Sequence, residues 1–166
     1  MLVFLTLPLL ALLLRIPLVD LLSYLLRENV RQALALSMKT TALTVLVTIL
    51  FGTPIAYLLA RRSFRGRTLL DTLIDLPMVL PPSVAGIALL VAFGRRGLLG
   101  QQLSMWGIEL AFTQSAVVLA QVFVAAPLYI KAASTGFMGV ERELEDAAAL
   151  DGASAWQVFR LITLPL

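Results

Sequence analysis

The chain has 166 residues, of which 13 are Lys or Arg and 10 are Asp or Glu, and 60% of it is hydrophobic with only 14% charged. Soluble domains average about 45–50% apolar and about 25% charged residues, so this composition indicates a membrane protein. The chain contains no His and no Cys, which excludes disulfides, Cys/His metal sites and catalysis by a Cys or His nucleophile. A net charge of +3 is too small to indicate nucleic-acid binding.

Apolar stretches in chain order predict about four helices that cross a membrane. Roughly 20 helical residues cover the hydrocarbon layer, and a helix satisfies its backbone hydrogen bonds within one segment. The first stretch is interrupted by Arg15, Pro17 and Asp20, and it lacks the charged start and the cleavage site of a signal peptide. We therefore expect an all-α membrane protein with a single transmembrane domain over residues 1–166. The expected spans lie at about residues 2–22, 40–60, 74–94 and 110–132.

The orientation of these spans follows from the arginines. Four arginines lie within the seven residues 61–67, directly after the second span. Short loops rich in Lys and Arg stay on the cytoplasmic side, so the N-terminus is expected in the cytoplasm, residues 94–109 outside and residues 131–166 inside. Residues 23–39 mix charged and apolar side chains at helical spacing, which predicts a short interfacial helix.

Polar residues and prolines within the spans allow different interpretations. Prolines 77, 81 and 82 cannot continue a regular helix, so they either open the backbone towards a cavity or begin the third helix. The threonines at 40, 44 and 48, and the glutamines at 114 and 121, each share a helical face, which favours interhelical hydrogen bonds over a pore lining. No ionisable residue lies in the middle of the second to fourth spans, which argues against a proton- or sodium-coupled carrier.

The segment 136–165 contains the most informative pattern in the chain. An acidic run at 141–146 begins an Ala-rich helix, Gly152 is expected to end it, and Ser154 is expected to cap a second helix that stops at Pro165. Such a segment is either an ordinary surface helix or a short helix that lies in a groove of a partner protein.

The residue pattern of this segment resembles the cytoplasmic loop signature of permease subunits of binding-protein-dependent ABC importers. The one departure is Asp146, where that family usually has Glu, although Glu145 precedes it. The resemblance implies a coupling helix that docks into an ATPase subunit. It also implies a six-helix permease fold, of which this chain would contain about four spans and lack the last two. The coupling residues that it implies are Glu145, Asp146, Ala147, Ala148, Gly152, Ile162, Leu164 and Pro165.

A second stretch narrows the resemblance. Residues 75–86 and 93–100 resemble the third span and outer loop of molybdate permeases, and sulfate/thiosulfate permeases share the Leu-Pro-x-x-Leu-Pro-Pro core. The resemblance implies a molybdate importer, with sulfate/thiosulfate or tungstate as alternative substrates and a truncated, non-transporting remnant as a further alternative. It also implies pathway or gate residues at the third span, namely Pro77, Pro81, Pro82, Ser83 and Gly86.

The chain carries no G-x-x-x-x-G-K-[ST] motif, so we expect it to be no enzyme itself and ATP hydrolysis to come from a partner. An intramembrane enzyme lacks support, because no H-E-x-x-H motif and no acidic pair within a span are present. The resemblance implies an inner-membrane location, no cofactor or metal, and no nucleic acid as a partner. The implied partners are an ABC ATPase subunit, a second permease copy in a homodimer, an extracytoplasmic substrate-binding protein and membrane lipid. Arg95 and Arg96 are either interfacial anchors or contacts for that binding protein.

Overall fold

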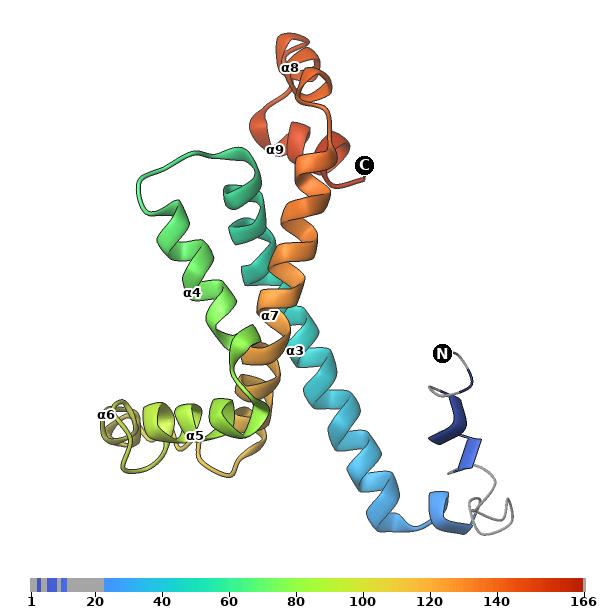
Figure 1. Ribbon diagram of the computed structural model, residues 1–166, viewed down its shortest axis with the longest axis vertical. Coiled ribbons are helices and arrows are strands. Elements are labelled where there is room, and N and C mark those ends of the chain that lie inside the picture. Colours follow the sequence, from blue (N-terminus) through green and yellow to red (C-terminus); the bar gives the residue numbers. More distant parts are fainter. Residues whose placement is uncertain (1–2, 4–5, 9, 12–22, 166) are drawn as a thin grey trace. The chain divides into compact units, whose positions relative to one another are not determined.

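The computed structural model of the chain describes residues 3, 6–8, 10–11 and 23–165 (Figure 1). These residues form helices and turns and no strand, which confirms the predicted all-α class. The chain divides into two units, residues 1–40 and 41–166. Most of the first predicted span, at about residues 2–22, lies outside the described residues.

The described part of the chain contains two long helices, α3 and α7, each followed by several shorter ones. α3 and α7 are each long and apolar enough to cross a membrane, and α4 with α5 pass the same test only as a bent pair. The elements are α3 (Glu28–Arg61), α4 (Arg67–Val79), α5 (Pro82–Phe93), α6 (Gly100–Met105), α7 (Gln114–Gly139), α8 (Arg142–Leu150), α9 (Ala155–Val158) and the π-helical turn η1 (Phe159–Thr163).

The second predicted span falls within α3, and most of the fourth falls within α7. α3 begins well before the predicted start at residue 40, so the short helix expected at 23–39 is instead mostly the first part of α3. No Gly or Pro lies between Glu28 and Phe51 to stop this helix. α7 begins later and ends later than predicted, which places Lys131 inside a helix.

The third predicted span, at 74–94, is divided between α4 and α5, which meet at an elbow bent by 117°. Leu80 and Pro81 are extended, with ψ angles of 131° and 143°. A residue before a proline avoids the helical region, and Pro82 then occupies the first turn of α5, where its missing N–H costs nothing. The interpretation that the prolines begin a helix is confirmed for Pro82, whereas an opening of the backbone towards a cavity stays a prediction.

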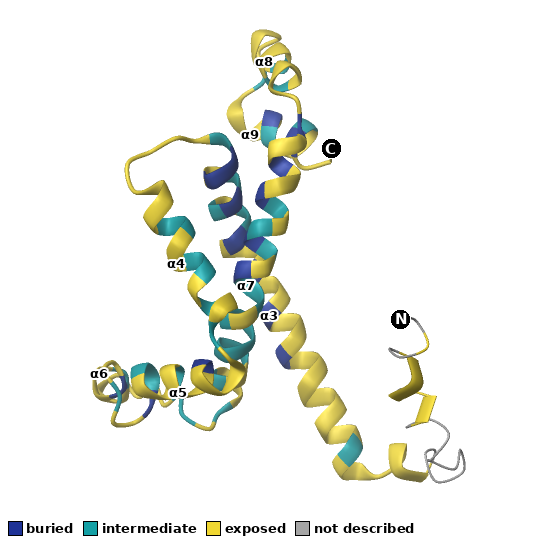
Figure 2. Ribbon diagram, in the orientation of Figure 1, coloured by how far each residue is buried: buried dark blue, intermediate teal, exposed yellow. Residues whose placement is uncertain are grey.

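The core lies where the second half of α3 packs on α7, and Figure 2 shows the buried residues concentrated there. Two interhelical hydrogen bonds reinforce this contact. The Thr44 hydroxyl donates to Gln121 Oε1 at 2.7 Å, and the Thr53 and Tyr129 hydroxyls lie 2.6 Å apart. The predicted interhelical role is thus confirmed for Thr44 and Gln121. It is not seen for Thr40, whose hydroxyl donates to the Ser37 carbonyl of its own helix, or for Thr48, whose buried hydroxyl has no partner among the described residues. The buried cluster consists of Ala56, Leu59, Ala60, Ile130 and Phe137.

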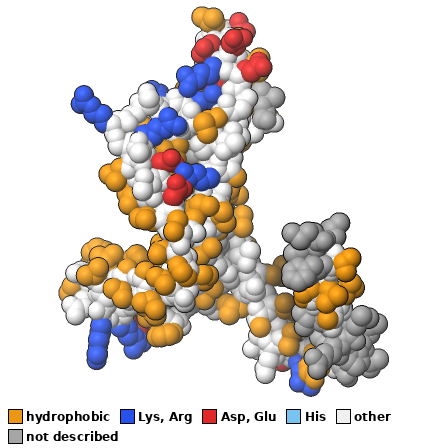
Figure 3. Space-filling model, viewed as in Figure 1, with side chains coloured by type: hydrophobic (Ala, Val, Ile, Leu, Met, Phe, Trp, Pro, Cys, Tyr) orange, Lys and Arg blue, Asp and Glu red, His pale blue; other side chains and the backbone are white. Residues whose placement is uncertain are grey.

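The outer surfaces of these helices are apolar and exposed (Figure 3). On α3, the side chains of Leu46, Leu50 and Phe51 are each more than 60% exposed. A soluble protein rarely exposes so much contiguous apolar surface, whereas lipid or partner helices would cover it at no cost.

We predict that Gly52→Ala destabilises the protein by about 1–3 kcal/mol, because it overpacks the contact between α3 and α7. A Cβ at this position would lie 2.7 Å from Cδ1 of the Tyr129 ring. The ring cannot turn away without losing the hydroxyl contact to Thr53. Thermal unfolding of the purified protein in detergent would measure the change.

The matched control is Gly136→Ala in α7, where nothing lies within 4 Å of the added Cβ. Alanine favours a helix over glycine by up to about 1 kcal/mol, so this variant should be neutral or slightly more stable. Equal effects of the two substitutions would contradict the close approach at Gly52.

Candidate functional site

The predicted coupling loop, residues 136–165, forms α8, α9 and η1 at one end of α7 (Figure 1). Extended residues at Val140 and Glu141, with ψ angles of 127° and 125°, separate α7 from α8. Glutamates in the first turn of α8 suit the positive end of its dipole. No residue of α8 is buried, and acidic side chains gather at this end of the molecule (Figure 3).

The turn after α8 has the geometry that the sequence predicted. Gly152 has a φ of +91°, and its N–H donates to the Ala149 carbonyl at 3.1 Å while the Ala153 N–H donates to the Ala148 carbonyl at 3.0 Å. A left-handed residue that closes the last turn in this way is usually glycine. The predicted helix stop at Gly152 is therefore confirmed.

Ser154 caps the next helix, as predicted. Its Oγ accepts from the Gln157 N–H at 3.4 Å, and Gln157 Oε1 accepts from the Ser154 N–H at 2.8 Å. This reciprocal capping box satisfies two N–H groups that the first turn leaves free. α9 then passes directly into the π-helical turn η1, where the Leu164 N–H donates to the Phe159 carbonyl at 2.9 Å.

The residues predicted to contact an ATPase do not share one environment. Most are exposed, but Ala148 and Ile162 are half-buried. Glu145 is turned inward, and its side chain is 14% exposed. The exposed members are Asp146, Ala147, Gly152, Leu164 and Pro165.

Glu145 belongs to a polar cluster that the sequence did not predict. Its Oε1 accepts hydrogen bonds from the Arg61 guanidinium at 2.9 Å and from the Thr163 hydroxyl at 2.6 Å. The same Arg61 nitrogen, NH2, also donates to the Val140 carbonyl at 3.0 Å. In the sequence, Arg61 stands out only as part of the arginine run, and no local pattern links it to an acid 84 positions away.

A second ionic cluster, also missed, joins α7 to α4. Lys131 Nζ donates to Asp71 Oδ1 at 2.6 Å and lies 3.0 Å from Asp75 Oδ1. The two aspartates are one helical turn apart on α4, so they share the face that meets α7. The three side chains are 34–48% exposed, so this cluster is only partly buried.

The five pathway candidates lie together at the elbow, away from the coupling loop. Pro77 is in the last turn of α4, and Pro81, Pro82, Ser83 and Gly86 are exposed around the start of α5. Figure 1 shows the elbow at the end of α4 opposite to α8. The structure therefore brings the candidates of each group together and keeps the two groups apart.

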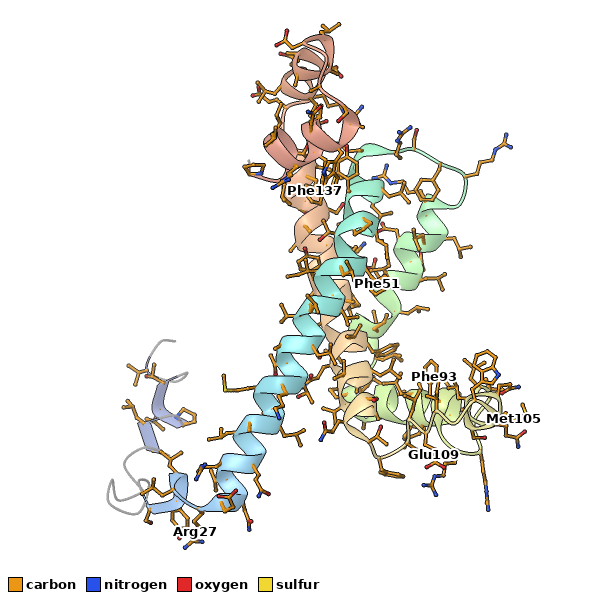
Figure 4. The ribbon with its side chains drawn as sticks, turned by 180° about the vertical axis from the view of Figure 1, so that it is seen from behind. Arg27, Phe51, Phe93, Met105, Glu109 and Phe137 are labelled. Atoms are coloured by element: carbon orange, nitrogen blue, oxygen red, sulfur yellow. The ribbon has the colours of Figure 1, made fainter. Side chains whose placement is uncertain are left out.

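The glycines at 94, 97 and 100 form a tight turn beyond α5. A side chain at Gly100 would overlap the carbonyl oxygen of Gly94, so glycine is required by close backbone contact. Arg95 next to this turn donates to Glu109 Oε2 at 3.0 Å, and both side chains are more than half exposed. Figure 4 shows Glu109 at the same end of the structure as Phe93, the last residue of α5.

We predict that Gly152→Val destabilises the turn between α8 and α9 whereas Gly152→Asn is tolerated. Nothing lies within 4 Å of an added Cβ, so only the backbone conformation opposes a side chain. A left-handed residue with a Cβ costs about 1–2 kcal/mol, and asparagine bears that conformation best. Thermal unfolding of both variants would measure the difference; equal stability would contradict a left-handed requirement.

Comparison with known proteins agrees with this architecture. The profile of the family described as "Binding-protein-dependent transport system inner membrane component" matches residues 49–166. The chain is 46% identical over 136 residues to the "Molybdenum transport system permease protein ModB" of Escherichia coli strain K12, covering 81% of this chain and 59% of that one.

Further relatives match a larger or a similar share of the chain. The ModB protein of Mycobacterium tuberculosis is 41% identical over 164 residues, 99% of this chain and 62% of its own length. A "probable sulfate transport system permease protein cysT" of Chlorella vulgaris is 38% identical over 133 residues, 80% of this chain and 50% of its own length. This chain therefore spans less than two thirds of these relatives, and it belongs to the family of binding-protein-dependent transport system inner membrane components.

Proposed function

We propose that the chain is the transmembrane subunit of an ABC importer for molybdate. The observation that carries this proposal is the identity of 41–46% to proteins named molybdenum transport permeases, over 79–99% of this chain. Relatives named sulfate permeases match at 37–38%, so sulfate or thiosulfate is the second candidate substrate. Molybdate, tungstate and sulfate are all tetrahedral dianions, so the choice of molybdate rests on the higher identity to the molybdenum permeases.

The proposed partners follow from the family and from the surface of the coupling loop. α8 presents Asp146 and Ala147 to solvent beside the Gly152 turn. Small side chains allow close approach, so this surface suits a groove on a separate ATPase subunit that hydrolyses ATP. An extracytoplasmic substrate-binding protein, a second permease copy and membrane lipid complete the proposed assembly. The exposed apolar side chains of α3 and α5 support contact with lipid or a second copy.

The proposed orientation places the N-terminus and the coupling loop in the cytoplasm. Its support is the arginine run at 61–67, which follows α3 directly. The elbow at Pro77–Pro82 is proposed to border the translocation path near its gate, because an opened helix inside a membrane needs a cavity or protein partners. Movement of α8 by the ATPase would then rock the helices between two arrangements.

We predict that Ala147→Cys is labelled by a membrane-impermeant maleimide only from the cytoplasmic side, and that it crosslinks to the ATPase. The chain has no other Cys, so the signal reports one position. Phe112→Cys is the control, because Phe112 is 94% exposed just before α7 and should be labelled only from outside. Labelling of position 147 from outside would reverse the proposed topology.

We also predict that cells lacking their own molybdate permease regain molybdate uptake when the chain is produced with its ATPase and binding protein. Mass-spectrometric measurement of cellular molybdenum would follow uptake, with cells that lack only this chain as the control. An equal concentration of sulfate should leave uptake largely unchanged. If sulfate outcompetes molybdate at equal concentration, the substrate is sulfate; if neither anion enters, the transport proposal is wrong.

A further inference from the structure

Four segments of the chain meet at one buried polar cluster, here called the joint: Arg61, Val140, Glu145 and Thr163. Arg61 comes from the last turn of α3, Val140 from the link after α7, Glu145 from α8 and Thr163 from η1. A single carboxylate oxygen of Glu145 accepts from both Arg61 and Thr163, and one guanidinium nitrogen of Arg61 reaches both Glu145 and Val140.

The side chains of the joint are mostly shielded from solvent, although no residue of α8 is fully buried. The side chains of Arg61 and Glu145 are 8% and 14% exposed, and Thr163 is 2% exposed. Taking two charges out of water is costly, so a buried ion pair is a poor source of stability. Its hydrogen bonds are directional and join four segments, so a displacement of α8 would break them and leave the Arg61 guanidinium, whose Nε already has no partner among the described residues, with fewer still.

The joint is also the main polar attachment of α8. In the part of the chain that the structure describes, Glu145 is the only α8 side chain that makes a hydrogen bond or ion pair to another helix. Glu143, on the same helix, makes neither within the described residues and is exposed. Without the joint, α8 would depend on its chain connections and on its contacts with α9 and η1.

Three aromatic rings, from α3, α7 and η1, pack against one another near the joint. The Tyr57 ring of α3 lies edge-on to Phe137 of α7 at 5.8 Å and to Phe159 of η1 at 5.1 Å between centroids. Figure 4 shows Phe137 at the end of α7 where α8 and α9 attach. Edge-on aromatic pairs of this kind hold their helices together beyond simple burial.

We propose that Arg61 and Glu145 are positioning residues that lock α8 to the end of α3, so that a push on α8 moves α3 and α7 as one body. This rests on the proposed function, in which α8 receives the movement of an ATPase. Glu145 and Asp146, two adjacent acids, then have different tasks: Glu145 transmits the movement inside the chain, while Asp146 remains on the exposed side of α8. Movement at one site can reach a distant site when helices joined in this way shift together between two packed arrangements.

The first test measures the position of α8 directly. Spin labels at Arg62→Cys and at the exposed Ala149→Cys, in the otherwise Cys-free permease in its complex with the ATPase, report the distance between the end of α3 and α8. The distribution should be narrow in the parent protein and broad in Glu145→Gln, which removes the charge but keeps the size. Glu143→Gln is the matched control on the same helix and should leave the distribution narrow. An unchanged distribution in Glu145→Gln would refute the proposal that the joint fixes the position of α8.

The second test measures coupling in vesicles that contain the permease, its ATPase and the binding protein. Glu145→Gln should capture the ATPase as the parent does, but transport per ATP hydrolysed should fall about tenfold, a typical size for coupling between two sites. Glu143→Gln should keep the parental ratio. A loss of ATPase capture with an unchanged ratio would identify Glu145 as a docking residue and refute the joint.

A failure of the parent protein to transport would refute the proposed function, while the distance measurement would still decide on the joint. Should Glu145→Gln not insert into the membrane, Thr163→Val is the second variant, because it removes one donor at almost constant volume. It should broaden the distance distribution and lower transport per ATP in the same direction, and no change in either would count against the joint.

Discussion

The close approach of α3 and α7 is the contact on which the rest of the described structure depends. Gly52, Ala56 and Ala60 are each four residues apart and buried, so they form a strip of small residues along one face of α3. Between helices in lipid there is no gain from hiding apolar surface, and association depends on close packing and hydrogen bonds. The strip allows Tyr129 and Ile130 of α7 to come close. α4 and η1 then attach to the pair that this contact forms.

Local features of the coupling loop could be predicted from the sequence because each depends on residues within one or two turns. The left-handed turn at Gly152 and the cap at Ser154 require only a neighbour three or four positions away. The start of α5 at Pro82 follows from proline geometry for the same reason. The bend at the elbow is different, since a hydropathy window averages over residues 74–94 and does not record a change of direction.

The two ionic clusters could not be predicted, because their partners are far apart in the sequence. Glu145 and Asp146 are adjacent acids on a helix without a buried face, so no periodicity tells which one turns inward. Lys131 was placed near the end of a span, whereas α7 continues to Gly139 and leaves it within the helix. Its position opposite Asp71 and Asp75 depends on how α4 packs on α7. Both ionic clusters are formed by tertiary contacts, so they can be identified only once the packing of the helices is known.

The ion pair between Arg61 and Glu145 has a consequence for how often the chain crosses a membrane. Its two ends must lie on the same side, so the residues between them cross an even number of times. If α7 spans the membrane, it accounts for one passage, and α4 with α5 must supply one more. An even number of crossings then requires that α4 and α5 together cross the membrane once, as a bent span and not as a re-entrant loop. Arg95 and Glu109, which follow α5, would then lie on the side of the membrane opposite Arg61.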